Sequence, residues 1–491
     1  MSALSRLHPA VPAATRVVLG AGAAAGLVWL ATTHGATLDL AAASGMREAP
    51  VAPTALATSI DTMCPGNELS GVAGIDDVGV GGRVAAAAGP DSLLPVPAGG
   101  RGAAQLTAGS VRLDRLTARP DAAAASLPRS GPVALRATGS LAPAVVGMQE
   151  WAATRSDRRG LVTTPCLAAG SDLWLLGGGA GAGRQERLVL VNPGGNPVTA
   201  EVTVHGATGP VAEPRTETVS PGGRVTVLLD AVAGEEGAPA VHVVATGGGL
   251  HATLTDSWID GSTPRGVETV VPADAASTVQ VVPAAVVGPG KATLRVVSPT
   301  DEEAVASVTV IGRDGPVTTS ADTVVTAGAQ GVAELALPKL PAGAYSVVVR
   351  SDTPVVAGVL TEVGAGRAPG DIGWAVSAPS IASVGGAALP ATSGVSRVLR
   401  LVSTGGASTA EVTLVVGGDE RARSVSLLAD RAVDVDLAGA SAVWVERTGG
   451  SGSLRGGLVS TAGTGANLLL SVVPLEPVAV TSPVSRAFPL P

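Results

Sequence analysis

The chain repeats a pattern of about 105 residues, and this repetition restricts its possible folds more than any other feature of the sequence. The segment from Pro132 to Trp151 resembles the segment from Pro239 to Trp258, and its closing tryptophan recurs 107 residues later. Prolines that end strand-like runs recur at similar spacing, at Pro165, Pro272, Pro379 and Pro474. A fixed period of this size indicates an array of similar structural units.

A second marker keeps the same period. Apolar runs begin at Leu188, Leu294 and Leu399, each 20 to 23 residues after one of the prolines. Counting back from Pro165 places the start of a first unit near Pro65, but only the second half of that unit matches the others well. We therefore expect four modules. Their expected boundaries are residues 61–166, 167–273, 274–380 and 381–476, followed by a tail at 477–491.

Each module has the pattern of a small β-sandwich. In the second module, eight runs rich in Val, Leu and Thr alternate with turn sequences such as Pro-Gly-Gly. Seven or eight strands in about 105 residues is the size of an immunoglobulin-like antiparallel sandwich. A propeller blade has about half that length, so a four-bladed ring is the alternative. The predicted fold is all-β, with short turns around Asp121 to Ser126 as the only helix-like feature expected after residue 50.

The N-terminal region carries an export signal. Two arginines precede an uncharged stretch at residues 17–38, and the first acidic residue is Asp39. A basic flank followed by an apolar segment is typical of a signal anchor, with residues 1–16 in the cytoplasm, or of a cleaved signal peptide. We therefore expect a single-pass membrane protein, or a secreted one if the signal is cleaved, with a linker at residues 39–60.

The chain has two cysteines, Cys64 and Cys166, and both follow the apolar segment. An even cysteine pair in an exported chain is usually a disulfide. The two residues lie beside the prolines that begin and end the first module, so a bond between them would join that module's first and last strands. Closing a loop of about 100 residues is worth up to about 4–5 kcal/mol in the chain-entropy model.

Composition narrows the functional classes. Hydrophobic residues make up 46% of the chain and charged residues 15%, a balance that favours folded domains over disorder. The net charge is −8 and the chain has two lysines, Lys291 and Lys339, so it offers no polycationic face for nucleic acid. We expect no nucleic-acid partner.

Two motifs resemble ligand loops but fail in detail. The glycine-rich run at residues 177–183 lacks the third glycine of a dinucleotide-binding turn, and no parallel-sheet pattern surrounds it. The segment that starts at Asp256 spaces its acids like a calcium loop, but Trp258 occupies a ligand position and Val267 replaces the bidentate acid. We expect neither a cofactor nor a metal.

Catalytic patterns are equally weak. The histidines of the exported part fall on different predicted strands without metal-ligand spacing, and the chain has no Gly-x-Ser-x-Gly sequence. Acidic residues are not gathered in the sequence as glycoside hydrolysis would require. Three aromatic residues, Trp151, Trp174 and Trp258, are candidates either for glycan stacking or for the core, and the equivalent positions of Trp151 and Trp258 favour core packing.

The stretch from Gly160 to Val211 resembles an actinomycete domain-of-unknown-function family of exported, N-terminally membrane-anchored cell-envelope proteins. The resemblance rests on Cys166, a Leu-Trp-Leu-x-Gly-Gly-Gly run, the sequence LVLVNP and the upstream MCPG at Met63. Members often lie near genes of envelope glycosyltransferases, which implies an envelope role but no activity and no catalytic residues.

These observations lead to three functional expectations. The first is a non-enzymatic extracytoplasmic scaffold or interaction module that contacts an envelope protein or glycan. The second is a carbohydrate-binding accessory protein of an envelope glycosyltransferase system, which would expose aromatic residues in one groove. The third is an envelope hydrolase, which would need converging acids or a Ser/His pair in a cleft.

Overall fold

The structure is a computed structural model that describes residues 55–72, 77–154, 158–234, 236–288, 290–318, 323–364 and 368–482. The expected membrane or signal segment at residues 17–38 lies outside the described residues. In the described part of the chain, no helix is long and apolar enough to cross a bilayer. Residues Leu56–Ser482 form one compact unit, which is built almost entirely from antiparallel strands.

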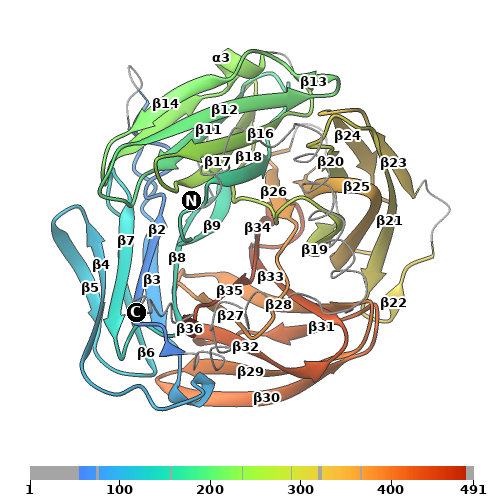
Figure 1. Ribbon diagram of the computed structural model, residues 1–491. Coiled ribbons are helices and arrows are strands. Elements are labelled where there is room, and N and C mark those ends of the chain that lie inside the picture. The colour runs from blue at the N-terminus through green and yellow to red at the C-terminus, as the bar shows by residue number, and fades with distance from the viewer. Residues whose placement is uncertain are drawn as a thin grey trace, which may run out of the picture. The chain divides into compact units, whose positions relative to one another are not determined.

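The strands fall into four consecutive sets of eight, coloured from blue to red in Figure 1. The first set consists of β2 (Ser59–Cys64), β3 (Arg83–Ala88), β4 (Gly102–Ala108), β5 (Val111–Leu116), β6 (Asp121–Ser126), β7 (Val133–Gly139), β8 (Val145–Ala153) and β9 (Gly160–Pro165). The second consists of β10 (Asp172–Leu176), β11 (Arg184–Val191), β12 (Val198–Gly206), β14 (Arg215–Val219), β15 (Arg224–Leu228), β16 (Ala240–Thr246), β17 (His251–Asp260) and β18 (Thr263–Val270).

The third set consists of β19 (Ser277–Val287), β20 (Lys291–Val297), β21 (Ala304–Gly312), β23 (Val324–Ala327), β24 (Val332–Ala336), the long β25 (Gly343–Val363), whose two halves serve as the sixth and seventh strands, and β26 (Asp371–Val376). The fourth consists of β27 (Val384–Ala388), β28 (Val395–Thr404), β29 (Ser408–Val416), β30 (Asp419–Leu427), β31 (Arg431–Asp436), β32 (Ala440–Gly450), β33 (Ser453–Ala462) and β34 (Leu469–Pro474).

Short elements connect or flank these strands. They are β1 (Ala55–Leu56), η1 (Asp91–Leu93), β13 (Gly209–Pro210), α3 (Asp230–Ala233), β22 (Gly315–Pro316), η2 (Gly465–Asn467), β35 (Glu476–Pro477) and β36 (Thr481–Ser482). The prediction of short turns around Asp121 to Ser126 is wrong. This segment forms strand β6, which pairs with β3. The sequence reasoning also missed α3, a helix of four residues.

All four sets have the same topology. With the strands of a set numbered one to eight in chain order, one sheet has the order 1-6-3-4 and the other the order 5-2-7-8. Each set therefore contains two sheets, whereas a propeller blade would contain one. Within every set, apolar residues of both sheets belong to a common core.

The sets also pack against one another in a closed cycle. The eighth strands lie together, with β9 contacting β18, β18 contacting β26, β26 contacting β34 and β34 contacting β9. Trp151 of the first set packs on Val267 of the second, and Trp374 of the third set is part of the core of the second. Leu470 of the fourth set joins the core of the third, and Met148 of the first joins the core of the fourth. The fourth set thus returns the chain to the first.

Candidate functional site

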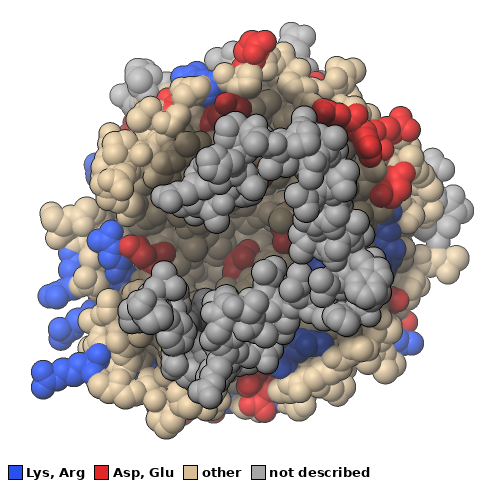
Figure 2. Space-filling view, in the orientation of Figure 1, with Lys and Arg blue, Asp and Glu red and all other residues tan. Residues whose placement is uncertain are grey.

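A cavity of about 450 Å³ lies where the chain leaves the eighth strands of all four sets. Cys166 follows β9, Asp274 follows β18 and Pro379 follows β26, and each of them lines the cavity. Glu476 follows β34 and completes this wall, while residues of β2 and β8 provide another. The cavity is therefore built by equivalent positions of the four sets. We call it the acidic cavity, and Figure 2 shows acidic side chains within the hollowed centre of one face.

Two carboxyl groups that line the acidic cavity have raised pKa values. Burial, and after it the negative charge of Asp274, raises the pKa of Glu476 to about 7. Burial also raises the pKa of Asp274, although the positive charge of Arg455 opposes this shift. A carboxyl group that titrates near neutral pH can hold a proton, release it, or bind a cationic group once it is ionised.

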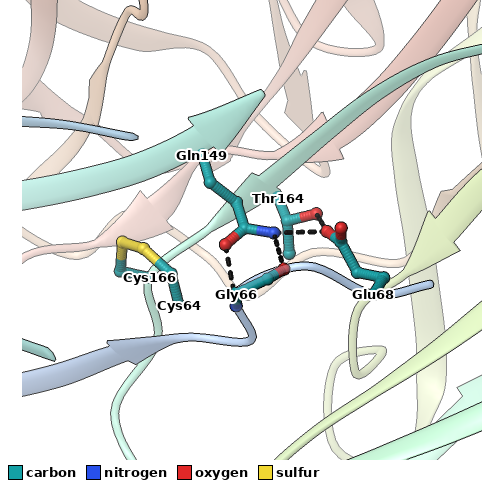
Figure 3. The surroundings of a disulfide bond; sticks show 6 residues. All are labelled: Cys64, Gly66, Glu68, Gln149, Thr164 and Cys166. Atoms are coloured by element: carbon teal, nitrogen blue, oxygen red, sulfur yellow. Dashed lines mark hydrogen bonds between the residues drawn. A yellow bond between two sulfur atoms is a disulfide. The ribbon is translucent and has the colours of Figure 1, made fainter. Parts of the chain in front are cut away.

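The disulfide forms one edge of the acidic cavity. Cys64, at the end of β2, is bonded to Cys166, immediately after β9, so the bond joins the first and last strands of the first set. Backbone hydrogen bonds between Met63 and Leu167 run beside it. Close to the bond, the Gln149 side chain accepts a hydrogen bond from the Gly66 amide at 3.0 Å and donates one to its carbonyl at 2.8 Å (Figure 3).

Gly66 has to be glycine at this point. Its φ angle is +77°, and a Cβ atom there would lie 1.8 Å from the carbonyl oxygen of Gly131. The close approach brings the chain past the disulfide and directs Glu68 into the interior, where it accepts hydrogen bonds from Thr164, Gln149 and the Trp151 indole. Burial raises the pKa of Glu68, although these donors oppose the shift.

Two further carboxyl groups are buried where the eighth strands meet. Glu268 on β18 accepts hydrogen bonds from Ser471 at 3.1 Å and from the Thr269 amide at 2.9 Å. Asp371, at the start of β26, accepts one from the Leu470 amide at 2.9 Å. Burial raises the pKa of both groups well above the usual range, and within the described residues each keeps one oxygen without a partner.

The glycine-rich run surrounds carboxylates of the protein itself. The Gly178 amide donates to Asp256 at 3.2 Å and the Gly179 amide donates to Glu186 at 2.9 Å. Arg184, at the end of the run, pairs with Asp256 at 2.5 Å. Burial tends to raise the pKa of Asp256, but the Arg184 guanidinium, the Trp374 indole and the Gly178 amide together lower it. The run therefore serves as an internal anion-binding loop that joins β10 to β11.

The segment from Asp256 to Asp260, which spaces its acids like a calcium loop, does not bring them together. Asp256 is buried and bound to Arg184, whereas Asp260 is exposed and pairs with Arg265 at 2.8 Å. Among the residues that the structure describes, no group of three or more Asp, Glu, His or Cys side chains is arranged to hold a metal ion.

The three candidate tryptophans occupy different environments. Trp151 is buried between the first and second sets and donates its indole N–H to Glu68 at 3.1 Å. Trp258 is half-buried, with the guanidinium groups of Arg184 and Arg265 over its ring. Trp174 is buried and lies against two histidines. None of the three lines the acidic cavity.

Sequence reasoning did not single out Asp274 or Glu476, although the repeat contained a signal for both. Each lies two residues after a repeated proline, Pro272 for Asp274 and Pro474 for Glu476. The equivalent positions in the other modules are Leu167 and Ile381, which are apolar. When the modules are aligned, this position is apolar in two of them and acidic in the other two. That pattern would have identified the pair.

Comparison with known proteins gives one family. A model described as "Family of unknown function (DUF5719)" matches residues 116–438. No curated protein matches the chain. A solved structure described as "Crystal Structure of Thermotoga maritima 1070" is similar with a TM-score of 0.19 and 12% identity, and the match covers 22% of this chain and 95% of that one. A likeness at this score supports no inference about fold or function.

Proposed function

This chain belongs to DUF5719, a family of unknown function, and from that premise we propose that it is a non-enzymatic scaffold of the cell envelope. In this proposal, residues 17–38 anchor the protein in the membrane or direct its secretion, and the strand sets lie outside the cytosol. The scaffold contacts an envelope protein or glycan through the acidic cavity. The disulfide supports an oxidising compartment, because such bonds are rare in the cytosol.

We further propose that the four sets are immunoglobulin-like modules with altered edges. In immunoglobulin domains the second strand pairs with the fifth and the third with the sixth, and every set here has both pairings. The edges differ, because the first strand of each set pairs with the sixth and the seventh pairs with the second. This arrangement places the eighth strand at the edge of its sheet, where it meets the eighth strands of neighbouring sets.

The main support for the proposal is the way in which the acidic cavity is built. Its wall comes from the same position of every set, so the closed cycle of contacts and the cavity arise together. A fold that joins four similar modules around an acidic cavity suits a protein that positions a partner, since rigid elements hold a site more accurately than loops do.

Chemical cross-linking in the native envelope tests this function. A double substitution of Asp274→Asn and Glu476→Gln removes the two cavity carboxyl groups with raised pKa values at little change in volume, and it should abolish the strongest cross-link to an envelope partner. Glu201→Gln, on an exposed position of β12, is the matched control and should leave the cross-link intact. An unchanged pattern in the double variant, or recovery of the chain from the cytosol, would contradict the proposal.

A second candidate function, an envelope hydrolase, is favoured by one observation. Asp274 and Glu476 share a cavity and burial raises the pKa of both, and a pair of carboxyls with perturbed pKa values is what general acid–base catalysis uses. Release of sugar or peptide from purified envelope by the wild-type chain, lost in Glu476→Gln, would replace the scaffold with an enzyme.

A further inference from the structure

A second cavity, of about 600 Å³, lies between the second and third strand sets. One of its walls is the face of the sheet formed by β10, β16 and β12 that points away from the core of the second set. Val202, Val204, Val241 and Val243 point into that core, so the residues alternating with them face the cavity. The third set contributes Pro299 and Gln330 to the opposite side.

A row of aromatic side chains crosses this wall. Trp174 on β10 lies directly opposite His242 on β16, which in turn lies opposite Thr203 on β12. The Trp174 and His242 rings are stacked at 4.2 Å between centroids with an interplanar angle of 9°. Asp172, two residues before Trp174 on β10, holds the imidazole through a 2.9 Å hydrogen bond to Nε2. The stacking covers one face of each ring and holds the pair in place.

His205 extends the row along β12 and offers a hydrogen-bond acceptor. Its ring centroid lies 4.9 Å from that of Trp174. Its Nδ1 lies 2.8 Å from the Gln330 carbonyl oxygen, which can only accept, so Nδ1 carries the proton. Burial lowers the pKa of this imidazole and keeps it neutral, so Nε2 presents a lone pair. That atom is buried and has no partner among the described residues.

We propose that this cavity binds a saccharide that packs against the stacked Trp174–His242 pair and donates a hydroxyl hydrogen bond to His205 Nε2. The ring atoms of Pro210, Pro214 and Pro299 provide further apolar surface, while the Thr203 hydroxyl and the Glu213 carboxylate are polar groups on the same wall. Cavities of this size are typical of small-molecule sites, and the mixture of apolar and polar surface in this one suits a ligand with both apolar faces and hydroxyl groups. A hydroxyl at Nε2 would satisfy a buried acceptor that otherwise has no hydrogen bond.

Two other ligands fit the cavity less well. A proline-rich peptide presents mainly carbonyl acceptors, which need donors from the protein, whereas His205 Nε2 and Glu213 both accept. A divalent transition metal would use the free Nε2, but no described group of three or more metal-binding side chains surrounds it. A polyol supplies the donors that the wall lacks.

This inference deepens the glycan-contact part of the proposed function, but it does not depend on the acidic cavity. Its test is the ¹⁵N resonance of His205 Nε2 in the full-length protein, followed at neutral pH during titration with maltose, cellobiose and chitobiose at millimolar concentrations. We expect at least one disaccharide to shift this resonance. We also expect the double variant Asp274→Asn and Glu476→Gln to respond in the same way, which separates the two proposals.

Two variants make the result specific. His205→Asn keeps a donor for the Gln330 carbonyl but is too short to place an acceptor where Nε2 lies, so it should weaken binding roughly tenfold, the worth of about one hydrogen bond. Glu201→Gln, an exposed substitution on the same strand, should bind as the wild type does. A silent Nε2 resonance with every disaccharide, a response to Zn²⁺ alone, or full binding by a folded His205→Asn protein would each overturn the proposal.

Discussion

The first and second strand sets share one topology but are stabilised differently. In the first set, β3 and β6 face each other as alanines, with Ala85 opposite Ala124 and Ala86 opposite Ala123. In the second set, the corresponding strand β11 contributes Leu188 and Leu190 to the core. Each buried methylene is worth about 0.8 kcal/mol, so an alanine core supplies much less stabilisation. The first set is closed by a disulfide bond, whereas the second set has no disulfide.

The two sets also differ in how they use polar groups. The second set buries Arg184 and Asp256 as a pair, and the Trp374 indole of the third set donates to the same carboxylate at 2.8 Å. The first set has an exposed pair, Arg136 with Asp61, with about half of each side chain in contact with solvent, and its buried Glu150 pairs with Arg397 of the fourth set. One topology therefore tolerates two sources of stability, a cross-link over a small-residue core or a large aliphatic core with a buried ion pair.

Removal of the disulfide is the strongest test of this comparison. Replacing Cys64 and Cys166 with alanine opens a loop that spans 102 residues and should cost about 4–5 kcal/mol of unfolding free energy in the chain-entropy model. Hydrogen exchange should then become faster in β2 to β9 first, because that core is the weaker one. Equal loss of protection in all four sets would show that the first set does not depend on its bond.

The buried ion pair is the matching test of the second set. Asp256→Ala leaves the Arg184 guanidinium buried without its main partner and should cost about 3–5 kcal/mol in chemical denaturation. Asp260→Ala, four residues further along β17, is the control, because its partner Arg265 can turn to water. A cost of less than about 1 kcal/mol for Asp256→Ala would mean that the aliphatic core alone supports the second set.

The buried carboxyl groups of the two sets should make the unfolding free energy depend on pH to different extents. Because burial raises the pKa of Glu268 well above 4.5, the folded protein holds a proton that the unfolded chain releases, and stability falls as pH rises above about 4.5. Glu268→Gln should remove this slope, which is about 1.4 kcal/mol per pH unit for one proton. Glu68→Gln should remove less of the slope, because hydrogen bonds from Trp151 and Gln149 favour its charged form.

Urea unfolding of both variants at several pH values between about 5 and 7 measures the two slopes. Identical pH profiles for wild type and Glu268→Gln would contradict the raised pKa of this residue.

The smallest effect is expected at the exposed ion pair of the first set. Arg136→Ala breaks a 3.2 Å contact with Asp61 in water-exposed surroundings and should change the unfolding free energy by less than about 1 kcal/mol. The effect should decrease further at high salt, since screening weakens such pairs. A larger cost would show that this exposed ion pair stabilises the first set, contrary to the comparison.

The sequence predicted the second set well and the first set poorly for one physical reason. Runs of Val, Leu and Thr identify strands, and all eight runs expected in the second module overlap the strands found there. Alanine is depleted in strands, so the segment Asp121 to Ser126 gave no strand signal, and its pairing with β3 through the sheet decides its conformation. The conformational preferences of neighbouring residues therefore predict a strand only where the segment is rich in larger side chains such as Val, Leu and Thr.

The candidate sites were less predictable, because they depend on which residues the cycle of sets brings together. Asp274 and Glu476 are 202 residues apart in the sequence and become neighbours only when the fourth set meets the second. His205 acquires its role from the Gln330 carbonyl of the next set. Nothing in the local sequence of these residues distinguishes them from ordinary surface positions.

The closed cycle also has a consequence for the order of folding. The contacts that close it are remote in sequence, such as the hydrogen bond from the Thr163 amide to Ser471, 308 residues away, and the bond from the Trp444 indole to the Ala144 carbonyl, 300 residues away. They cannot form until the last set has been synthesised, and contacts of such separation form slowly. The disulfide needs only residues up to Cys166, so the earliest set, which has the weakest core, can be secured while it waits for the others.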